Sequence, residues 1–252
     1  FDEYRAVAAE QAFPVRTIVS PFAQLMLDAG TVDEALGRIT DLSADTGGKL
    51  RIGPVKLLLD GSIQGFSVRL RWPGYFNGAP NGLWYTPPET VRETYTLALK
   101  NEVLVHTHTN GDEATEMALD CLEQALRAVP TPDHRFTLQH CQLADAAQFR
   151  RMKRLGTCAN LFPNRHFYWG DQHRAVTVGP ERAERMNACR TAQNTGVVFG
   201  IHSAAPITPL GPLFTAWCAV NRTTSSGRLL GPEERLSVAE ALHAVTLGAA
   251  YT

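Results

Sequence analysis

The chain has 252 residues, of which 44% are hydrophobic and 19% charged, with a formal net charge of -1. This composition excludes a collagen-like or disordered chain. The balanced charge argues against a protein that binds nucleic acid by neutralising phosphates or that docks on an anionic membrane surface. No apolar run approaches the roughly 20 residues that cross a bilayer, so we expect no membrane partner.

Short apolar segments alternate with amphipathic ones along the chain, which predicts strands alternating with helices. In chain order the predicted elements are a strand at 15–19, a helix at 31–44 that begins with the capping box of Thr31 and Glu34, a strand at 55–59, a helix at 89–100, a strand at 103–106, a helix at 112–127, a strand at 135–140, a helix at 145–154, a strand at 157–161, short helices at 181–186 and 190–195, a strand at 197–202 and a helix that begins with the capping box of Ser237 and Glu240.

Two stretches between these elements are predicted to be irregular. The segment at 63–88 is rich in Gly, Pro, Asn and aromatic residues, and loops of this length are usually lids or binding loops, with a packed Ω-loop as the alternative. The segment at 164–173 is predicted to be a polar, aromatic loop. Both are expected to cover a binding site.

The alternation of six strands with helices predicts right-handed βαβ units and a parallel sheet within a single domain, residues 1–252. No glycine-rich nucleotide-binding motif follows any strand, so a nucleotide cofactor is unsupported. The pattern leaves two α/β architectures, an open doubly wound sheet and a (β/α)₈ TIM barrel.

Five cysteines are spread along the chain, an odd number without a CxxC pair. They are Cys121, Cys141, Cys158, Cys189 and Cys218. Widely spaced cysteines of this kind are typical of reduced, buried thiols. The first residues show neither the basic start nor the apolar centre of a signal peptide, so we expect a cytoplasmic protein.

Ionisable side chains occur at the carboxyl ends of four predicted strands. Lys56 lies in the strand at 55–59, His106 and His108 end the next strand, His140 ends the third, and His202 ends the last. Ligands of parallel α/β folds bind at this end of the strands, where loops and helix N-termini converge. A single histidine is more often an ordinary core residue. Ionisable side chains at the ends of four strands together, however, predict a divalent metal site.

Lys56 interrupts an otherwise apolar strand, where a charged and unpaired amine would be costly. One interpretation is an ion pair at the end of the strand, with Asp60 or Asp112 as the partner. The other is a functional lysine, either a catalytic amine or a metal-bridging lysine carboxylated by CO₂.

Several segments in this order resemble the amidohydrolase superfamily, and more narrowly its YtcJ-like branch (amidohydrolase family 3), which includes the N-substituted formamide deformylases. The segments are VKLLLDGS at 55–62, HTNGD at 108–112, LQHCQ at 138–142, FYWGDQH at 167–173, GPER at 179–182, HSAAPI at 202–207 and ALHAVT at 241–246. The resemblance implies a distorted TIM barrel that holds one or two divalent metals, zinc above all, at its C-terminal mouth. Carried over position by position, Lys56, His108 and His140 match the family's metal ligands.

Two positions depart from the family pattern. The HxH motif of the family's first strand is absent, so the resemblance predicts an incomplete barrel that begins near the third strand and runs to the eighth. The family's metal-binding aspartate on the eighth strand is replaced, since the sequence there reads His202-Ser203-Ala204. Alanine has no group that binds a metal or carries a proton.

The resemblance implies a metal-dependent hydrolase in which metal-activated water cleaves a non-peptide, amide-type carbon–nitrogen bond of a small molecule. His202 and the position of Ala204 are expected to be catalytic, with Asp171 as a substitute carboxylate. Expected substrate contacts are His106, His166, Trp169, His173 and Asp171. The alternative is an inactive relative or a barrel fragment that binds a ligand or a partner chain, because the open sheet edges of an incomplete barrel call for a second copy or a missing N-terminal segment.

Overall fold

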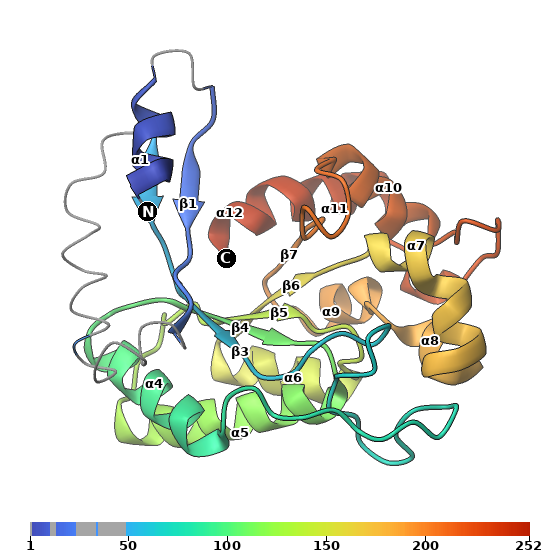
Figure 1. Cartoon of the computed structure of the whole chain (residues 1–252), viewed down its shortest axis with the longest axis horizontal. Coiled ribbons are helices and arrows are strands. Elements are labelled where there is room, and N and C mark those ends of the chain that lie inside the picture. The colour runs from blue at the N-terminus through green and yellow to red at the C-terminus, as the bar shows by residue number, and fades with distance from the viewer. Residues whose placement is uncertain (1, 11–13, 24–33, 35–48) are drawn as a thin grey trace.

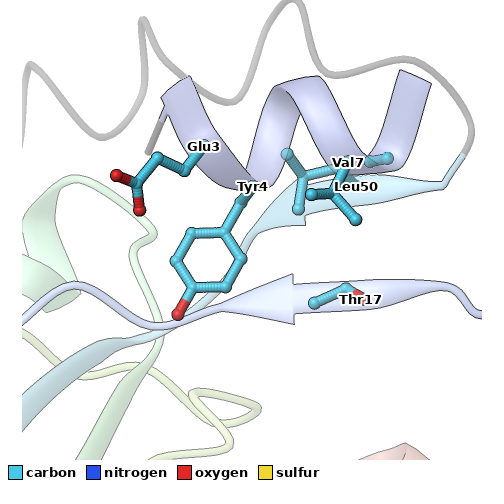
Figure 2. Close-up of a pocket in the computed structure, with 6 residues that line it drawn as sticks. Glu3, Tyr4, Val7, Thr17 and Leu50 are labelled. Carbon is cyan, nitrogen blue, oxygen red and sulfur yellow. The ribbon is translucent and has the colours of Figure 1, made fainter. Parts of the chain in front are cut away.

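The computed structural model describes residues 2–10, 14–23, 34 and 49–252, and its centre is a five-stranded parallel sheet (Figure 1). The strands of this sheet are β3 (Val55–Leu58), β4 (Val105–Thr109), β5 (Thr137–His140), β6 (Cys158–Leu161) and β7 (Phe199–Ile201). A separate pair of parallel strands, β1 (Thr17–Val19) and β2 (Leu50–Ile52), precedes it. All six predicted strands are confirmed, whereas β2 was not predicted.

The helices follow the strands in the order that βα units require. They are α1 (Asp2–Ala9), α4 (Pro88–Lys100), α5 (Asp112–Ala128), α6 (Ala146–Leu155), α7 (Asn164–Gln172), α8 (Gly179–Arg185), α9 (Cys189–Thr195), α10 (Pro212–Asn221), α11 (Val238–His243) and α12 (Ala249–Tyr251). Short 3₁₀ and π segments complete the set, at Pro232–Glu234, His173–Thr177 and Ala244–Gly248.

The strands of the sheet stand in sequence order, β3-β4-β5-β6-β7, with every neighbouring pair parallel. A doubly wound sheet reverses its order at a switch point, whereas a barrel wall does not. The backbone N–H of Lys56 also donates to the carbonyl of Pro21 at 2.8 Å, so the chain that follows β1 lies beside β3. The predicted incomplete TIM barrel is therefore confirmed, with β3 to β7 as consecutive strands of its wall.

The outer face of the sheet is covered by helices that pack on alternate strand residues. Val55 and Leu57 of β3 are fully buried in the main core, together with Tyr95 of α4 and Leu119 of α5. Figure 1 shows α4, α5 and α6 lying along this side of the sheet. Because side chains of a strand alternate between faces, the residues between these apolar ones point to the inside of the barrel wall.

The long segment at 63–87 is irregular, as predicted, but it has a core of its own. Ile63, Val68, Leu70 and Tyr75 are buried in a second hydrophobic cluster with a residue of α8 and residues of the loops after β5, around α8 and after α10. Trp72, by contrast, is 94% exposed. The packing has the character of an Ω-loop that is anchored at its base.

The helices of the structure differ from the predicted ones at residues 164–172 and 212–221. The predicted loop at 164–173 is wrong, because these residues form α7 and enter the π turn at 173–177. Helix α10 was missed, since its sequence PLFTAWCAVN is apolar almost all round and shows no amphipathic period. Of the predicted helix at 31–44, all residues except Glu34 lie outside the described ranges.

All five cysteines are buried and free, in agreement with the prediction of reduced thiols. Among the helices that the structure describes, none combines the length and the apolar character needed to span a bilayer.

A stability test follows from the capping box of α11, which the sequence predicted. The hydroxyl of Ser237 accepts from the N–H of Glu240, and the Glu240 carboxylate accepts from the N–H of Ser237. We expect Ser237→Ala to lower the free energy of unfolding by about 1 kcal/mol, and Ser237→Gly by only a few tenths. Urea unfolding of the two variants measures both values, and equal losses would contradict the cap.

Candidate active site

The register of the sheet aligns three ionisable residues on the inside of the barrel wall. Lys56 pairs with His106, and Leu58 pairs with His108. Since residues two apart on a strand share a face, Lys56, His106 and His108 all point inward. The structure thus brings together the lysine and the His-Thr-His pair that the sequence singled out.

His140 joins this group through a change in backbone conformation at the end of β5. Strand alternation would place Gln139 and His140 on opposite faces, yet Gln139 donates to the inward-facing His106 at 3.1 Å. His140 has φ 73°, which takes it out of the extended strand. Its ring lies 4.5 Å from the ring of His108 and 4.9 Å from that of His202, centroid to centroid.

Three histidines from three strands, His108, His140 and His202, therefore stand in a row. Burial lowers the pKa of His108 and of His202 to about 3, and it lowers the pKa of His140 well below its usual range. The three rings are neutral at physiological pH, which is the form that binds metals and accepts protons. The Nδ1 atom of His140 is buried and has no hydrogen-bond partner among the residues that the structure describes.

The hydrogen bonds of His202 determine its tautomer. Its Nδ1 accepts from the backbone N–H of Ala204 at 3.1 Å, so this nitrogen carries no proton. In a neutral ring the proton then lies on Nε2, which is buried and unpartnered. His202 therefore offers an N–H donor, and not a lone pair, to a ligand.

A buried carboxylate organises the neighbouring strand ends. Asp60 accepts from the backbone N–H groups of Asn110 at 2.9 Å, of Gly111 at 2.8 Å and of Arg69 at 3.2 Å. Burial raises its pKa to about 7, against the opposing effect of these hydrogen bonds. His108 Nε2 lies 3.7 Å from Asp60 and 2.8 Å from the Gly61 carbonyl. Asp60 thus ties the end of β3 to the end of β4 and to the long segment.

Lys56 does not form the ion pair that was one interpretation of its position. Within the described part of the chain no carboxylate lies within ion-pair distance of its amine, and Asp60 is engaged by backbone N–H groups. Burial lowers the pKa of Lys56 to about 7. A substantial fraction of the amine is neutral at pH 7, and only the neutral amine can ligate a metal or react with CO₂.

A second set of polar groups surrounds His106 and occupies both of its ring nitrogens. His106 accepts at Nδ1 from Gln139 and donates from Nε2 to the Thr252 carbonyl at 2.8 Å, and Asn160 donates to Gln139 at 3.0 Å. Helix α12 approaches this set closely, since a Cβ on Gly200 would lie 2.8 Å from Ala249 Cα. Both nitrogens of His106, an expected substrate contact, are therefore occupied.

The expected substrate contacts on α7 and in the turn after it occupy different environments. Both ring nitrogens of His166 lie 3.0 Å from backbone carbonyls, those of Pro163 and Met186. His173 is buried, with Nδ1 against the Thr177 hydroxyl and Nε2 unpartnered. The structure therefore places His166 as a core residue whose single N–H donates to a backbone carbonyl, whereas Nε2 of His173 has no partner among the described residues.

The other two residues of this group lie outside the histidine row. Trp169 is half-buried and its ring stands 5.7 Å from that of Tyr168. Asp171 is paired with Arg228 at 3.2 Å, and that arginine is half-exposed. Among the described residues, its carboxylate forms no hydrogen bond or ion pair with His108, His140 or His202.

Two residues at the site were not foreseen from the sequence, Phe162 and Arg165. Phe162 is fully buried, with its ring 5.1 Å from His202, and the guanidinium of Arg165 lies 4.9 Å from the centre of that ring. Arg165 donates to the side-chain oxygens of Asn110, at 2.5 Å, and of Gln142. An arginine inside an apolar and aromatic stretch could have indicated a buried functional charge. The prediction of a loop at 164–173 led us to overlook it.

Ala204 follows β7 and has a backbone conformation unusual for alanine, with φ 49°. Left-handed conformations cost an ordinary L-residue roughly 1–2 kcal/mol, and Asp, Asn and Gly tolerate them best. The backbone here suits the aspartate of the family pattern better than it suits alanine.

A metal ion fits this donor set only in part. The adjacent rings of His108 and His140, the free Nδ1 of His140 and the unpaired amine of Lys56 have the right chemistry. Yet no three His, Cys, Asp or Glu side chains in the described ranges converge as a metal-binding group. His202 presents a donor, and Ala204 presents nothing. These residues supply part of a metal site and not a complete one.

Comparison with known proteins identifies the family to which this barrel belongs. The whole chain, residues 1–252, matches the amidohydrolase family. The chain belongs to this family. It is 28% identical over 221 residues to YtcJ of Bacillus subtilis (strain 168), which covers 86% of this chain and 41% of that protein. It is also 28% identical over 162 residues to the N-substituted formamide deformylase of Arthrobacter pascens, which covers 63% and 30%.

The fold is found in solved structures of the family. An uncharacterized metal-dependent hydrolase from Pyrococcus furiosus superposes with a TM-score of 0.72 and 28% sequence identity, over 86% of this chain and 44% of that one. The predicted resemblance to the amidohydrolases and the α/β barrel class are thus both confirmed. The chain spans less than half the length of these relatives.

The backbone strain at Ala204 can be measured. We expect Ala204→Gly to raise the free energy of unfolding by about 0.5–1 kcal/mol, because relief of the left-handed strain exceeds the entropy that glycine adds to the unfolded chain. Ala147→Gly, at an exposed position of α6, is the matched control and should lower stability by about 0.5–1 kcal/mol. Urea unfolding measures both values. A change in unfolding free energy of the same sign in both variants would contradict backbone strain at Ala204.

The buried, neutral His173 predicts a dependence of stability on pH. Burial lowers its pKa from 6.5 to about 3. The stability it contributes is complete above pH 6.5 and is lost as the pH falls towards 3, because only the unfolded chain binds the proton. We expect His173→Gln to reduce the slope of unfolding free energy against pH in this window by about 1.4 kcal/mol per pH unit. Urea unfolding across a pH series measures it.

Thr177→Val provides the control for this measurement. It removes the hydroxyl that contacts His173 but no titrating group. It should lower stability at every pH and leave the slope as it is. A slope that is unchanged in His173→Gln would show that the ring takes up its proton in the folded protein.

Proposed function

We propose that this chain acts as a metal-dependent hydrolase that cleaves a non-peptide, amide-type carbon–nitrogen bond of a small molecule. Membership of the amidohydrolase family supports hydrolysis of such bonds. The name of the Arthrobacter relative supports an N-substituted amide, and that of the Pyrococcus structure supports metal dependence. The observation that carries the proposal is the gathering of Lys56, His108, His140 and His202 on one inner rim of the barrel.

Lys56, His108 and His140 are the residues that would hold the metal in this proposal. Imidazole nitrogens favour zinc among the common divalent ions of hydrolases, and the partly neutral amine of Lys56 can ligate directly or after carboxylation. When bound, such an ion supplies a Lewis acid that acidifies water and polarises a carbonyl. The remaining ligands do not lie among the residues that the structure describes.

His202 would act on the carbonyl oxygen of the substrate. Its Nε2–H is buried, unpartnered and held in one tautomer by the N–H of Ala204. A preorganised donor in a water-poor site stabilises the negative charge that develops on the oxygen during hydrolysis. Phe162, stacked 5.1 Å away, holds the ring in place.

Proton transfer is the step for which this chain lacks a group. A carboxylate at position 204 would take a proton from water and return it to the leaving nitrogen, but alanine does neither. This observation favours a second candidate function, an inactive relative that binds a small-molecule ligand or a partner chain through the same barrel.

The two candidates are separated by restoring the carboxylate. We expect Ala204→Asp, supplied with zinc, to hydrolyse members of a panel of N-substituted formamides at least about 100-fold faster than the unchanged chain, the range in which general bases contribute. Release of the primary amine is the measurement. The left-handed φ of 49° at this position favours a folded variant.

Metal content, measured on the same samples, serves as the control. Zinc should be retained by Ala204→Asp and lost in Ala204→Asp combined with His140→Asn, which keeps a polar side chain without the imidazole. Failure of the folded Ala204→Asp variant to hydrolyse any amide, with or without bound zinc, would overturn the proposed function and leave the ligand-binding candidate.

A further inference from the structure

The inner rim of the barrel contains buried hydrogen-bond donors without acceptors. His202 presents an N–H from Nε2 and Arg165 presents a buried Nε–H, and neither has a partner among the residues that the structure describes. Lys56 contributes a partly protonated amine to the same rim. Unpaired donors in a buried site are costly, so a site that keeps them is prepared for an acceptor from outside the chain.

Arg165 differs from Arg222, which is also deeply buried. Arg222 directs its guanidinium at the backbone carbonyls of Glu184, Met186, Asn187 and Leu230, and it thereby ties α8 and α10 to the loops around them. These four carbonyls use its Nε and both terminal nitrogens, which is the pattern of an arginine that stabilises the fold.

Arg165, which is only 3% exposed, uses a single terminal nitrogen, Nη1, for its contacts with Asn110 and Gln142. Both partners are neutral amide oxygens. Its Nε has no partner in the described part of the chain, and its guanidinium lies against the Phe162 ring at 4.9 Å. The Nε–H is therefore held in position and left without an acceptor.

The charge of Arg165 also lacks a counter-ion in the described part of the chain. Asp60 is the carboxylate that acts on it electrostatically, but no oxygen of Asp60 lies within ion-pair distance of the guanidinium. Three backbone N–H groups, those of Arg69, Asn110 and Gly111, already occupy the Asp60 oxygens. A buried guanidinium without a counter-ion is stabilised strongly by an anion that enters the site.

We propose that Arg165 binds a carboxylate of the substrate, so that the amide cleaved at this rim belongs to a molecule that also carries a negative charge, such as an N-acyl amino acid. The planar fork of a guanidinium matches a carboxylate better than any other small anionic group except phosphate. This inference rests on the proposed function for the amide end of the ligand, whereas the carboxylate end is recognised whether or not the bond is cleaved.

The position of Arg165 relative to the histidine row supports this arrangement. Phe162 lies beside both groups, with the guanidinium of Arg165 at 4.9 Å and the ring of His202 at 5.1 Å from its centroid. A ligand that reaches both has its carboxylate at Arg165 and its amide oxygen near the Nε2–H of His202. Because both groups contact Phe162, an N-acyl α-amino acid, whose carboxylate lies one carbon from the amide nitrogen, is the natural probe of this arrangement.

The test is a binding measurement that does not need turnover. N-acetylglycine and its neutral twin N-acetylglycinamide are titrated into the unchanged chain by ligand-observed NMR. We expect the acid to bind at least about tenfold more tightly than the amide, since charge-assisted pairs in buried sites are worth that much or more. Equal affinity for the two ligands would overturn the inference.

Two pairs of variants assign the effect to Arg165. Arg165→Met should abolish the preference for the acid. Arg165→Lys keeps a charge but not the fork, and should retain only part of the preference, so it decides the question even if Arg165→Met does not fold. Arg222→Lys is the matched control, expected to lower stability and keep the full preference. A full preference in Arg165→Lys or in Arg165→Met would contradict the assignment.

The outcome is distinguishable from that of the proposed function. If Ala204→Asp fails to hydrolyse any amide while the Arg165-dependent preference for the acid is present, the hydrolase proposal fails and the carboxylate site stands. If hydrolysis is restored but neutral amides bind and react as well as acids do, the hydrolase proposal stands and the carboxylate site is refuted.

Discussion

The in-register pairing of five successive parallel strands is the constraint on which the rest of the structure depends. It places apolar residues such as Val55 and Leu57 under the outer helices and places Lys56, His106 and His108 on the inner face. The burial that stabilises the sheet and the polarity of its inner face are two consequences of one period-two pattern. A slip of the register by one residue would bury the lysine in the core and expose the leucine.

The strand ends depart from this regular pattern, and the departures create the site. His140 turns inward because its backbone leaves the extended region, and Ala204 occupies the same unusual left-handed region after β7. Asp60 holds the corresponding turn after β4 by accepting from the N–H groups of Asn110 and Gly111. Strained or specially bonded backbone of this kind is common at functional sites, where it aims side chains that a strand would point elsewhere.

The electrostatics of the inner rim follow from its burial. Neutral imidazoles, a lysine whose pKa is lowered to about 7 and a buried arginine all lie on one side of the sheet, and Asp60 is already engaged by backbone groups. Such an environment lacks negative charge. A metal-bound anion, a carboxylated lysine or a substrate carboxylate would each supply it, which links the metal proposal to the proposed recognition of an acid.

The sequence by itself determined the α/β class, the six strands and the gathering of Lys56, His108, His140 and His202, because alternation of apolar runs and the polarity of strand ends are local patterns. Those patterns left a doubly wound sheet and a barrel both open, and only the family resemblance implied the barrel. It could not show that residues 164–172 form a helix, nor that Arg165 reaches the site from it, since these depend on packing between segments far apart in the chain. The same is true of the His202 tautomer and of the hydrogen bonds of His106 and His166. Hydrogen-bond partners are decided by tertiary structure, and they separate a histidine that is free to bind from one that only supports the fold.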